Sequence, residues 1–121
     1  MSHPAVHHQI NYIEFTTSSI EKTKAFYSSV FGWEFKDWGP DYIDCNPSSA
    51  GIAIGFAKGD PGLAPAKGAP IVVLYSADLK ATEAAIVAAG GNVVVPTFEF
   101  PGGRRFHFAD GLGNTLAVWS E

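Results

Sequence analysis

The chain has 121 residues, of which 46% are hydrophobic and 17% charged, the size and composition of one ordinary domain with its own core. Its 8 Lys and Arg against 12 Asp and Glu give a net charge of -4, and the basic residues are scattered, which argues against nucleic acid as a partner. No apolar run approaches the roughly 18 to 20 residues that span a bilayer, so no membrane partner is expected.

Cysteine usage and the first residues bear on the compartment. The single cysteine, Cys45, cannot form an internal disulfide, and the opening Met-Ser-His-Pro lacks the basic and apolar regions of a signal peptide. We therefore expect a cytoplasmic protein in which Cys45 is a small core residue.

The first half of the sequence predicts a strand, a helix and three more strands. Alternation over Gln9–Thr17 places Ile13 and Phe15 on one face of a half-buried strand. The Ser18-x-x-Glu21 spacing of a capping box then predicts a helix to about Phe31, ended by Gly32. The further strands, separated by turn signals, are expected at Trp33–Trp38, Tyr42–Asn46 and Gly51–Ala57.

The second half repeats this order after a linker rich in Pro and Gly. Pro70–Ser76 predicts a strand, and Asp78 an N-cap for a helix over Leu79–Ala89 that Gly90-Gly91 ends. The β segments expected after it are Asn92–Val95, Thr97–Phe100, Arg104–Ala109 and Thr115–Trp119, the middle two flanking the turn Pro101-Gly102-Gly103.

An offset of 59 residues maps one half onto the other. It pairs Ser19 with Asp78 and Gly32 with Gly91. A single βαβββ unit would leave one face of its sheet bare, so two units are expected to share or enclose that face. The sequence thus predicts an α+β fold of two βαβββ modules, whose paired, curved, mixed sheets surround a cleft. One domain is expected over 1–121, with modules at 8–58 and 70–120 and a linker at 59–69.

Two motifs suggest a family. Phe26-Tyr27-x-x-Val30-Phe31-Gly32-Trp33 closes the first helix, and Asp110-Gly111-x-Gly113-Asn114 precedes the last strand. With the two βαβββ units, they resemble the vicinal oxygen chelate superfamily of glyoxalases, bleomycin resistance proteins and extradiol dioxygenases. The resemblance covers residues 8–120 and is greatest to the glyoxalase-related branch, through Tyr12-Ile13-Glu14.

The resemblance also implies where a divalent metal would bind. Metal-dependent members carry ligands on the first, fourth, fifth and eighth strands. The first-, fifth- and eighth-strand positions are occupied here by Tyr12, Ile71 and Ala117, and the expected fourth strand contains no acid. Because a divalent ion needs three or four N or O donors, we expect no metal cofactor.

Two residues are candidates for catalysis. Glu14 should lie on the strand face opposite Ile13 and Phe15 and point into the cleft, where a carboxylate partly withdrawn from water suits a general base. The alternative is a carboxylate that hydrogen-bonds a neighbouring Tyr or Arg. His107 should share the cleft-facing side of its strand with Arg105 and could move protons or, with Glu14, recruit a metal; the alternative is a pocket-lining hydrogen-bonding residue.

The remaining candidates would bind a ligand. Arg105 could hold a carboxylate through its planar fork of donors, or be a surface residue beside the hairpin. Aromatic side chains could line the cleft for a flat or apolar molecule, although each could equally be core. The predicted ligand-binding residues are Tyr12, Thr16, Tyr75, Arg105 and Trp119.

Three functions remain open at this level. The first is a metal-independent, glyoxalase-like module that binds a small organic molecule in the cleft. The second is a lyase or isomerase that uses Glu14 as base, with or without a metal recruited by Glu14 and His107. The third is a non-catalytic dimerising domain, and the family resemblance implies a homodimer in any of the three cases.

Overall fold

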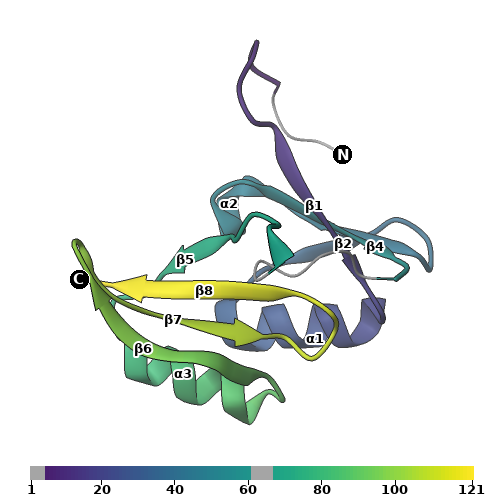
Figure 1. Ribbon diagram of the computed structural model, residues 1–121. Coiled ribbons are helices and arrows are strands. Elements are labelled where there is room, and N and C mark those ends of the chain that lie inside the picture. Colours follow the sequence, from purple (N-terminus) through teal and green to yellow (C-terminus); the bar gives the residue numbers. More distant parts are fainter. Residues whose placement is uncertain (1–4, 61–66) are drawn as a thin grey trace. The chain divides into compact units, whose positions relative to one another are not determined.

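Two four-stranded mixed sheets, one in each half of the chain, form the architecture in the computed structural model (Figure 1). The structure describes residues 5–60 and 67–121. The chain divides into two units, Met1–Pro61 and Gly62–Glu121. The predicted linker at 59–69 falls mostly on residues 61–66, which lie outside the described residues, as does His3 of the N-terminal segment.

The first unit contains one long helix beside its sheet. Its strand order is β1-β4-β3-β2, in which β1 pairs with β4 in parallel and the other pairs are antiparallel. The elements in chain order are β1 (Tyr12–Thr17), α1 (Ile20–Phe31), β2 (Phe35–Asp37), β3 (Tyr42–Cys45), α2 (Pro47–Ala50) and β4 (Ala53–Lys58).

The second unit has the same topology. Its strand order is β5-β8-β7-β6, again with one parallel pair, β5 with β8, followed by antiparallel pairs. The elements are β5 (Val73–Tyr75), α3 (Leu79–Ala88), β6 (Asn92–Phe100), β7 (Gly103–Ala109) and β8 (Thr115–Ser120). The predicted α+β fold of two βαβββ modules is therefore confirmed.

The internal repeat extends to the hydrogen bonds that begin each long helix. Ser19 caps α1 by accepting from the Lys22 amide at 3.3 Å, and Asp78 caps α3 by accepting from the Ala81 amide at 3.1 Å. Next to each cap, two side-chain hydroxyls form a hydrogen bond with each other. Their oxygens are 2.6 Å apart for Thr17 and Thr23, and 2.7 Å apart for Ser76 and Thr82. Each residue of the second group follows its counterpart by 59 positions.

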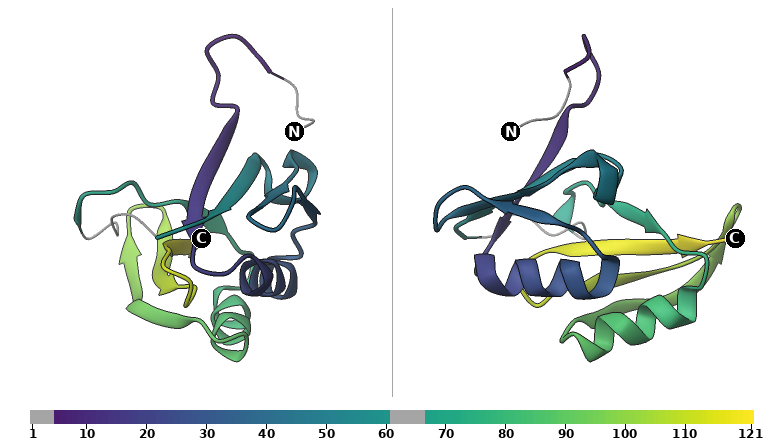
Figure 2. Two further views of the ribbon diagram at one scale, coloured as in Figure 1. Left: turned by 90° about the vertical axis from the view of Figure 1, so that its right-hand side faces the viewer. Right: turned by 180° about the vertical axis from the view of Figure 1, so that it is seen from behind.

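Each sheet packs one face against its own long helix. In the first unit α1 lies on β3 and β4, and the fully buried ring of Tyr27 stacks on Trp33 at a centroid distance of 5.0 Å. In the second unit α3 packs against β6 and β8, on one face of the sheet (Figures 1 and 2), and the side chains of Phe106 and Phe108 on β7 are fully buried. No helix among the described residues is long and apolar enough to cross a membrane.

Several local predictions differ from the structure. Ser19 is the N-cap of α1 rather than Ser18, so Lys22 stands where the capping box would need an acid. The expected turn after Cys45 contains the short helix α2, capped by Asn46. The helix α3 ends at Ala88, one residue earlier than expected, and Gly90, one of the two glycines expected to end it, is left-handed with φ 98°.

The largest difference concerns β6, where two separate β segments were expected. Asn92–Phe100 is one strand that continues through Pro96. The register shifts between Val93 and Val95 and again between Val95 and Phe98, so Pro96 lies in an irregular stretch of an edge strand. Such positions tolerate proline because its missing N–H breaks no regular ladder bond.

Candidate functional site

The face of the second sheet that points away from α3, here called the open face of sheet 2, carries most of the predicted ligand-binding residues. Phe106 and Phe108 are buried on the α3 side, so the alternation along β7 places Arg105 and His107 on the open face. Cross-strand pairing completes two rows. These are Tyr75–Trp119–Arg105–Phe98 and Val73–Ala117–His107–Val95.

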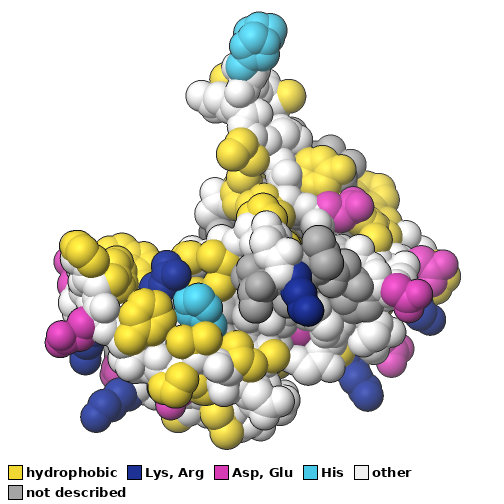
Figure 3. All heavy atoms as spheres, in the orientation of Figure 1, with side chains coloured by type: hydrophobic (Ala, Val, Ile, Leu, Met, Phe, Trp, Pro, Cys, Tyr) yellow, Lys and Arg dark blue, Asp and Glu magenta, His cyan; other side chains and the backbone are white. Residues whose placement is uncertain are grey.

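A pocket of about 250 Å³ opens on this face. Aromatic rings surround it: Trp119 lies with its ring centroid 5.0 Å from Tyr75 and 6.2 Å from Phe100. Figure 3 shows hydrophobic side chains gathered around histidine and basic side chains on this part of the molecule. The pocket residues are Val73, Phe100, Gly102, Arg105 and Trp119.

Two polar atoms on this face are buried without a hydrogen-bond partner among the described residues. They are Nε of Arg105 and Nε2 of His107. Buried polar groups in proteins are nearly always hydrogen-bonded, because leaving one unpaired costs about 1–3 kcal/mol. An unpaired donor beside a pocket therefore marks a position where a ligand could supply the missing acceptor.

The electrostatic environment of His107 is set by the same neighbours. Burial, and then the positive charge of Arg105, hold the pKa of His107 below its ordinary value of 6.5. Its ring also lies 5.8 Å from that of Phe98. Both effects disfavour the protonated imidazole, so Arg105 supplies the positive charge of this pair.

The corresponding face of the first sheet, the open face of sheet 1, is organised differently. Glu14 faces Gly55 on β4, and Asp44 faces Gly55 from the other side. Glu14 is exposed and forms a side-chain hydrogen bond with Tyr42. Burial, followed by the charge of Glu14 and this hydrogen bond, raises the pKa of Tyr42 to about 12.

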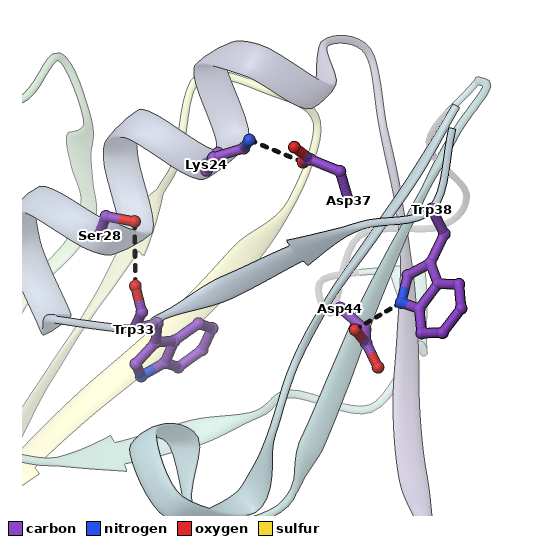
Figure 4. Close-up of polar contacts among 6 residues, drawn as sticks. All are labelled: Lys24, Ser28, Trp33, Asp37, Trp38 and Asp44. Atoms are coloured by element: carbon purple, nitrogen blue, oxygen red, sulfur yellow. Dashed lines mark hydrogen bonds and ion pairs between the residues drawn. The ribbon is translucent and has the colours of Figure 1, made fainter. Parts of the chain in front are cut away.

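Asp44 is the most buried acid of this face, with 8% of its surface exposed. Its carboxylate accepts a hydrogen bond from the indole Nε1 of Trp38 at 2.8 Å (Figure 4), and Lys36 lies over the Trp38 ring with Nζ 4.1 Å from the centroid. The same view shows two contacts that tie α1 to β2 and the segment before it: Lys24 pairs with Asp37 at 2.7 Å, and Ser28 donates to the Trp33 carbonyl at 3.0 Å. The polar side chains of this sheet thus satisfy one another.

The structure therefore distributes the predicted site residues over two units. Tyr12, Glu14 and Thr16 alternate with inward residues along β1 and share the open face of sheet 1. The open face of sheet 2 brings together the other four, which are Tyr75, Arg105, His107 and Trp119.

Sequence reasoning missed three participants. Phe98 and Phe100 pack around the Arg105 guanidinium, whose central carbon is 5.4 Å and 5.8 Å from their ring centroids. Their alternation in Thr97–Phe100 was a usable signal. Tyr42, the partner of Glu14, could not be found in this way, because its placement depends on the β3–β4 register, which pairs Tyr42 with Ala57 and brings its side chain over Gly55.

The family's metal positions do not fit a divalent ion in this chain. Ala117 is fully buried in the row between Val73 and His107, and neither Ala117 nor Ile71 carries a side-chain donor atom. Tyr12 offers only a phenol oxygen. Within neither unit do three or more His, Cys, Asp or Glu of residues 5–60 and 67–121 gather into a group that could hold a metal.

With this geometry in place, comparison with known proteins identifies the class. The profile of the Glyoxalase/Bleomycin resistance protein/Dioxygenase superfamily matches residues 9–118, and the chain belongs to this superfamily. A glyoxylase-like domain-containing protein of Didymella fabae is 30% identical over 93% of this chain and 94% of its own length.

Two further proteins are similar. CFP32 of Mycobacterium bovis is 30% identical over 90% of this chain, which spans only 44% of that relative. The crystal structure of the fosfomycin resistance protein FosX from Listeria monocytogenes superimposes with a TM-score of 0.77 at 18% identity, covering 94% of this chain and 90% of that one. That FosX structure contains Mn(II) and a dihydroxypropylphosphonic acid. At this identity, the likeness to FosX shows a shared fold alone.

Proposed function

We propose that this chain is a glyoxalase-like module that binds a small organic molecule on the open face of sheet 2 without the metal of its relatives. The observation that carries the proposal is the pair of buried, unpartnered nitrogens, Arg105 Nε and His107 Nε2, beside an aromatic pocket of about 250 Å³. Small-molecule sites commonly combine apolar walls with a few convergent polar groups.

The parts of the site have distinct tasks. The Trp119 and Phe100 rings provide flat apolar walls for the body of the ligand. Arg105 and His107 donate hydrogen bonds to its polar end, His107 from Nε2 in the tautomer that carries the proton there. No proton transfer or metal is needed for binding of this kind.

The lyase or isomerase alternative depends on Glu14. That carboxylate is exposed and accepts a hydrogen bond from the Tyr42 hydroxyl. In the proposed function Glu14 is a structural acceptor that positions Tyr42. Turnover of a carbonyl or epoxide substrate that Glu14→Gln abolishes would restore the enzyme alternative.

Equilibrium dialysis with 2-naphthoate and its neutral counterpart 2-naphthamide tests the proposal. We expect the native protein to bind at least one of these probes at a single site, and Trp119→Ala to weaken that binding by about fivefold or more, since loss of an aromatic wall costs about 1 kcal/mol or more. Trp38→Ala removes the indole of the first unit and should leave binding unchanged. Absence of binding, or equal loss in the two variants, contradicts the proposal.

A further inference from the structure

The open face of sheet 2 carries a positive charge that the protein does not compensate. The direct cross-strand neighbours of Arg105 are Trp119 and Phe98, and no salt bridge in the part of the chain that the structure describes involves its guanidinium. A cation partly withdrawn from water and left unpaired is unfavourable, so the surroundings of Arg105 favour the arrival of an anion.

The acids of the second unit are engaged or placed elsewhere. Glu121 accepts a hydrogen bond from the Tyr75 hydroxyl at 2.5 Å. Glu99 belongs to the row of Arg104 and Ser120, on the opposite face of the sheet. Asp110 accepts hydrogen bonds from the amides of Leu112 and Asn114 in the loop before β8. Asp78 caps α3 and Glu83 lies on that helix, on the other side of the sheet, so the anion that Arg105 lacks must come from outside the described side chains of this unit.

The pocket limits the size and shape of that anion. A volume of about 250 Å³ suits a molecule of one or two rings, and the walls formed by Trp119 and Phe100 suit a flat apolar body. The planar guanidinium fork matches the two oxygens of a carboxylate. Arg105 is the only cation among the described pocket residues, and a single positive charge favours a monoanion.

We infer that the ligand class is an aromatic monocarboxylate of one or two rings, whose carboxylate binds Arg105 and His107 while its rings pack against Trp119 and Phe100. This inference rests on the proposed function and narrows it. The carboxylate would supply acceptors to both unpartnered nitrogens and neutralise the charge of Arg105 in one step.

Isothermal titration calorimetry of the full chain with 2-naphthoate, 2-naphthamide and inorganic phosphate tests the ligand class. The amide has the shape of the carboxylate but no charge. We expect 2-naphthoate to bind at least about tenfold more tightly than 2-naphthamide, since hydrogen bonds to charged groups are worth more than neutral ones. Phosphate, which lacks an aromatic body, should bind more weakly than 2-naphthoate.

Three variants test whether the preference for 2-naphthoate over 2-naphthamide depends on Arg105. Arg105→Gln should remove the preference for the carboxylate, so that 2-naphthoate binds no more tightly than 2-naphthamide. Arg105→Lys keeps the charge but not the fork, so its preference should be intermediate. Arg104→Gln changes the preceding arginine, on the opposite face of the sheet, and should leave both affinities unchanged. Circular dichroism confirms that each variant is folded.

The outcomes separate this inference from the proposed function. Equal affinity of the native protein for the amide and the carboxylate overturns the ligand class and leaves small-molecule binding intact. Phosphate binding as tight as 2-naphthoate also overturns it, because the rings would then contribute nothing. Binding of neither aromatic probe rejects both proposals.

Discussion

Gly55 shows how one absent side chain shapes the open face of sheet 1. A Cβ at this position would overlap the Tyr42 hydroxyl and lie 2.8 Å from its Cζ. The glycine therefore leaves the space in which the Tyr42 phenol crosses β4 to reach Glu14 on β1. The hydrogen bond between Glu14 on β1 and Tyr42 on β3 therefore depends on the missing side chain of Gly55 on β4, the strand between them.

Alkaline titration tests this arrangement. Tyr42 ionises near pH 10 in the unfolded chain but at about 12 in the folded one, so the folded state binds one more proton between these values. The stability that Tyr42 contributes is full below pH 10 and is lost as the pH rises to about 12. We expect Tyr42→Phe to flatten this loss in pH-dependent urea unfolding and to remove a phenol that ionises at about pH 12 from the ultraviolet titration.

Tyr12→Phe is the matched control, because it removes a phenol from the same sheet face and keeps the burial of Tyr42 and its hydrogen bond to Glu14, which raise the Tyr42 pKa more than the charge of Tyr12 does. It should leave the late ionisation in place. If Tyr42→Phe instead removes a phenol that ionises near pH 10, the hydrogen bond to Glu14 does not hold in solution.

At the scale of secondary-structure elements, the hairpin between β6 and β7 depends on Gly103. Its φ of 154° lies in a region that side chains rarely adopt, and an added Cβ would overlap the Ser120 carbonyl oxygen and lie 2.9 Å from the Glu121 Cα. Both atoms belong to the backbone, one at the last residue of β8 and one at the residue after it. Unlike a side chain, they cannot make room by changing rotamer. The glycine thus permits β7 to begin its pairing against the last residues of the chain.

Gly103→Ala should consequently destabilise the protein by about 1–3 kcal/mol, the usual range for backbone strain and overpacking. Urea unfolding measures the loss. Gly102→Ala is the neighbouring control: its Cβ would meet only the Phe100 ring, at 3.1 Å, and that ring can shift. Equal losses in the two variants would mean that the backbone contact at Gly103 is unimportant.

The same elements show what a sequence can predict. The repeat, both long helices and most strands follow from periodicity and caps, because residues such as Ser19 and Asp78 act through neighbours three positions away. Register is different. The continuation of β6 through Pro96 and the position of Tyr42 over Gly55 depend on which residues face each other across strands, and local patterns do not encode this.

The candidate site divides in the same way. Alternation along β7 was sufficient to place Arg105 and His107 on one face, and Tyr75 and Trp119 join them in the structure. That both nitrogens would be buried without a partner could not be predicted, because it depends on the Phe98 and Phe100 rings that surround them.

Considered as a whole, the molecule is symmetric in fold and asymmetric in chemistry. Both units share one topology and one type of helix start. In the first unit the polar groups of the open face pair with one another, as Glu14 does with Tyr42 and Asp44 with Trp38. In the second, Tyr75 pairs with Glu121, but Arg105 Nε and His107 Nε2 have no partner among the described residues. The fold is that of the superfamily. The proposed position of the ligand rests on the two unpartnered nitrogens, Arg105 Nε and His107 Nε2.

The most direct test of that placement is the side-chain Nε–H resonance of Arg105 in ¹⁵N-labelled protein during titration with 2-naphthoate. We predict a saturable shift of this resonance with the affinity measured by calorimetry, accompanied by a change at His107 Nε2. The Nε–H of Arg104 and the indole N–H of Trp38 should remain in place. A bound probe that shifts either of these two groups and leaves Arg105 unchanged would contradict the account.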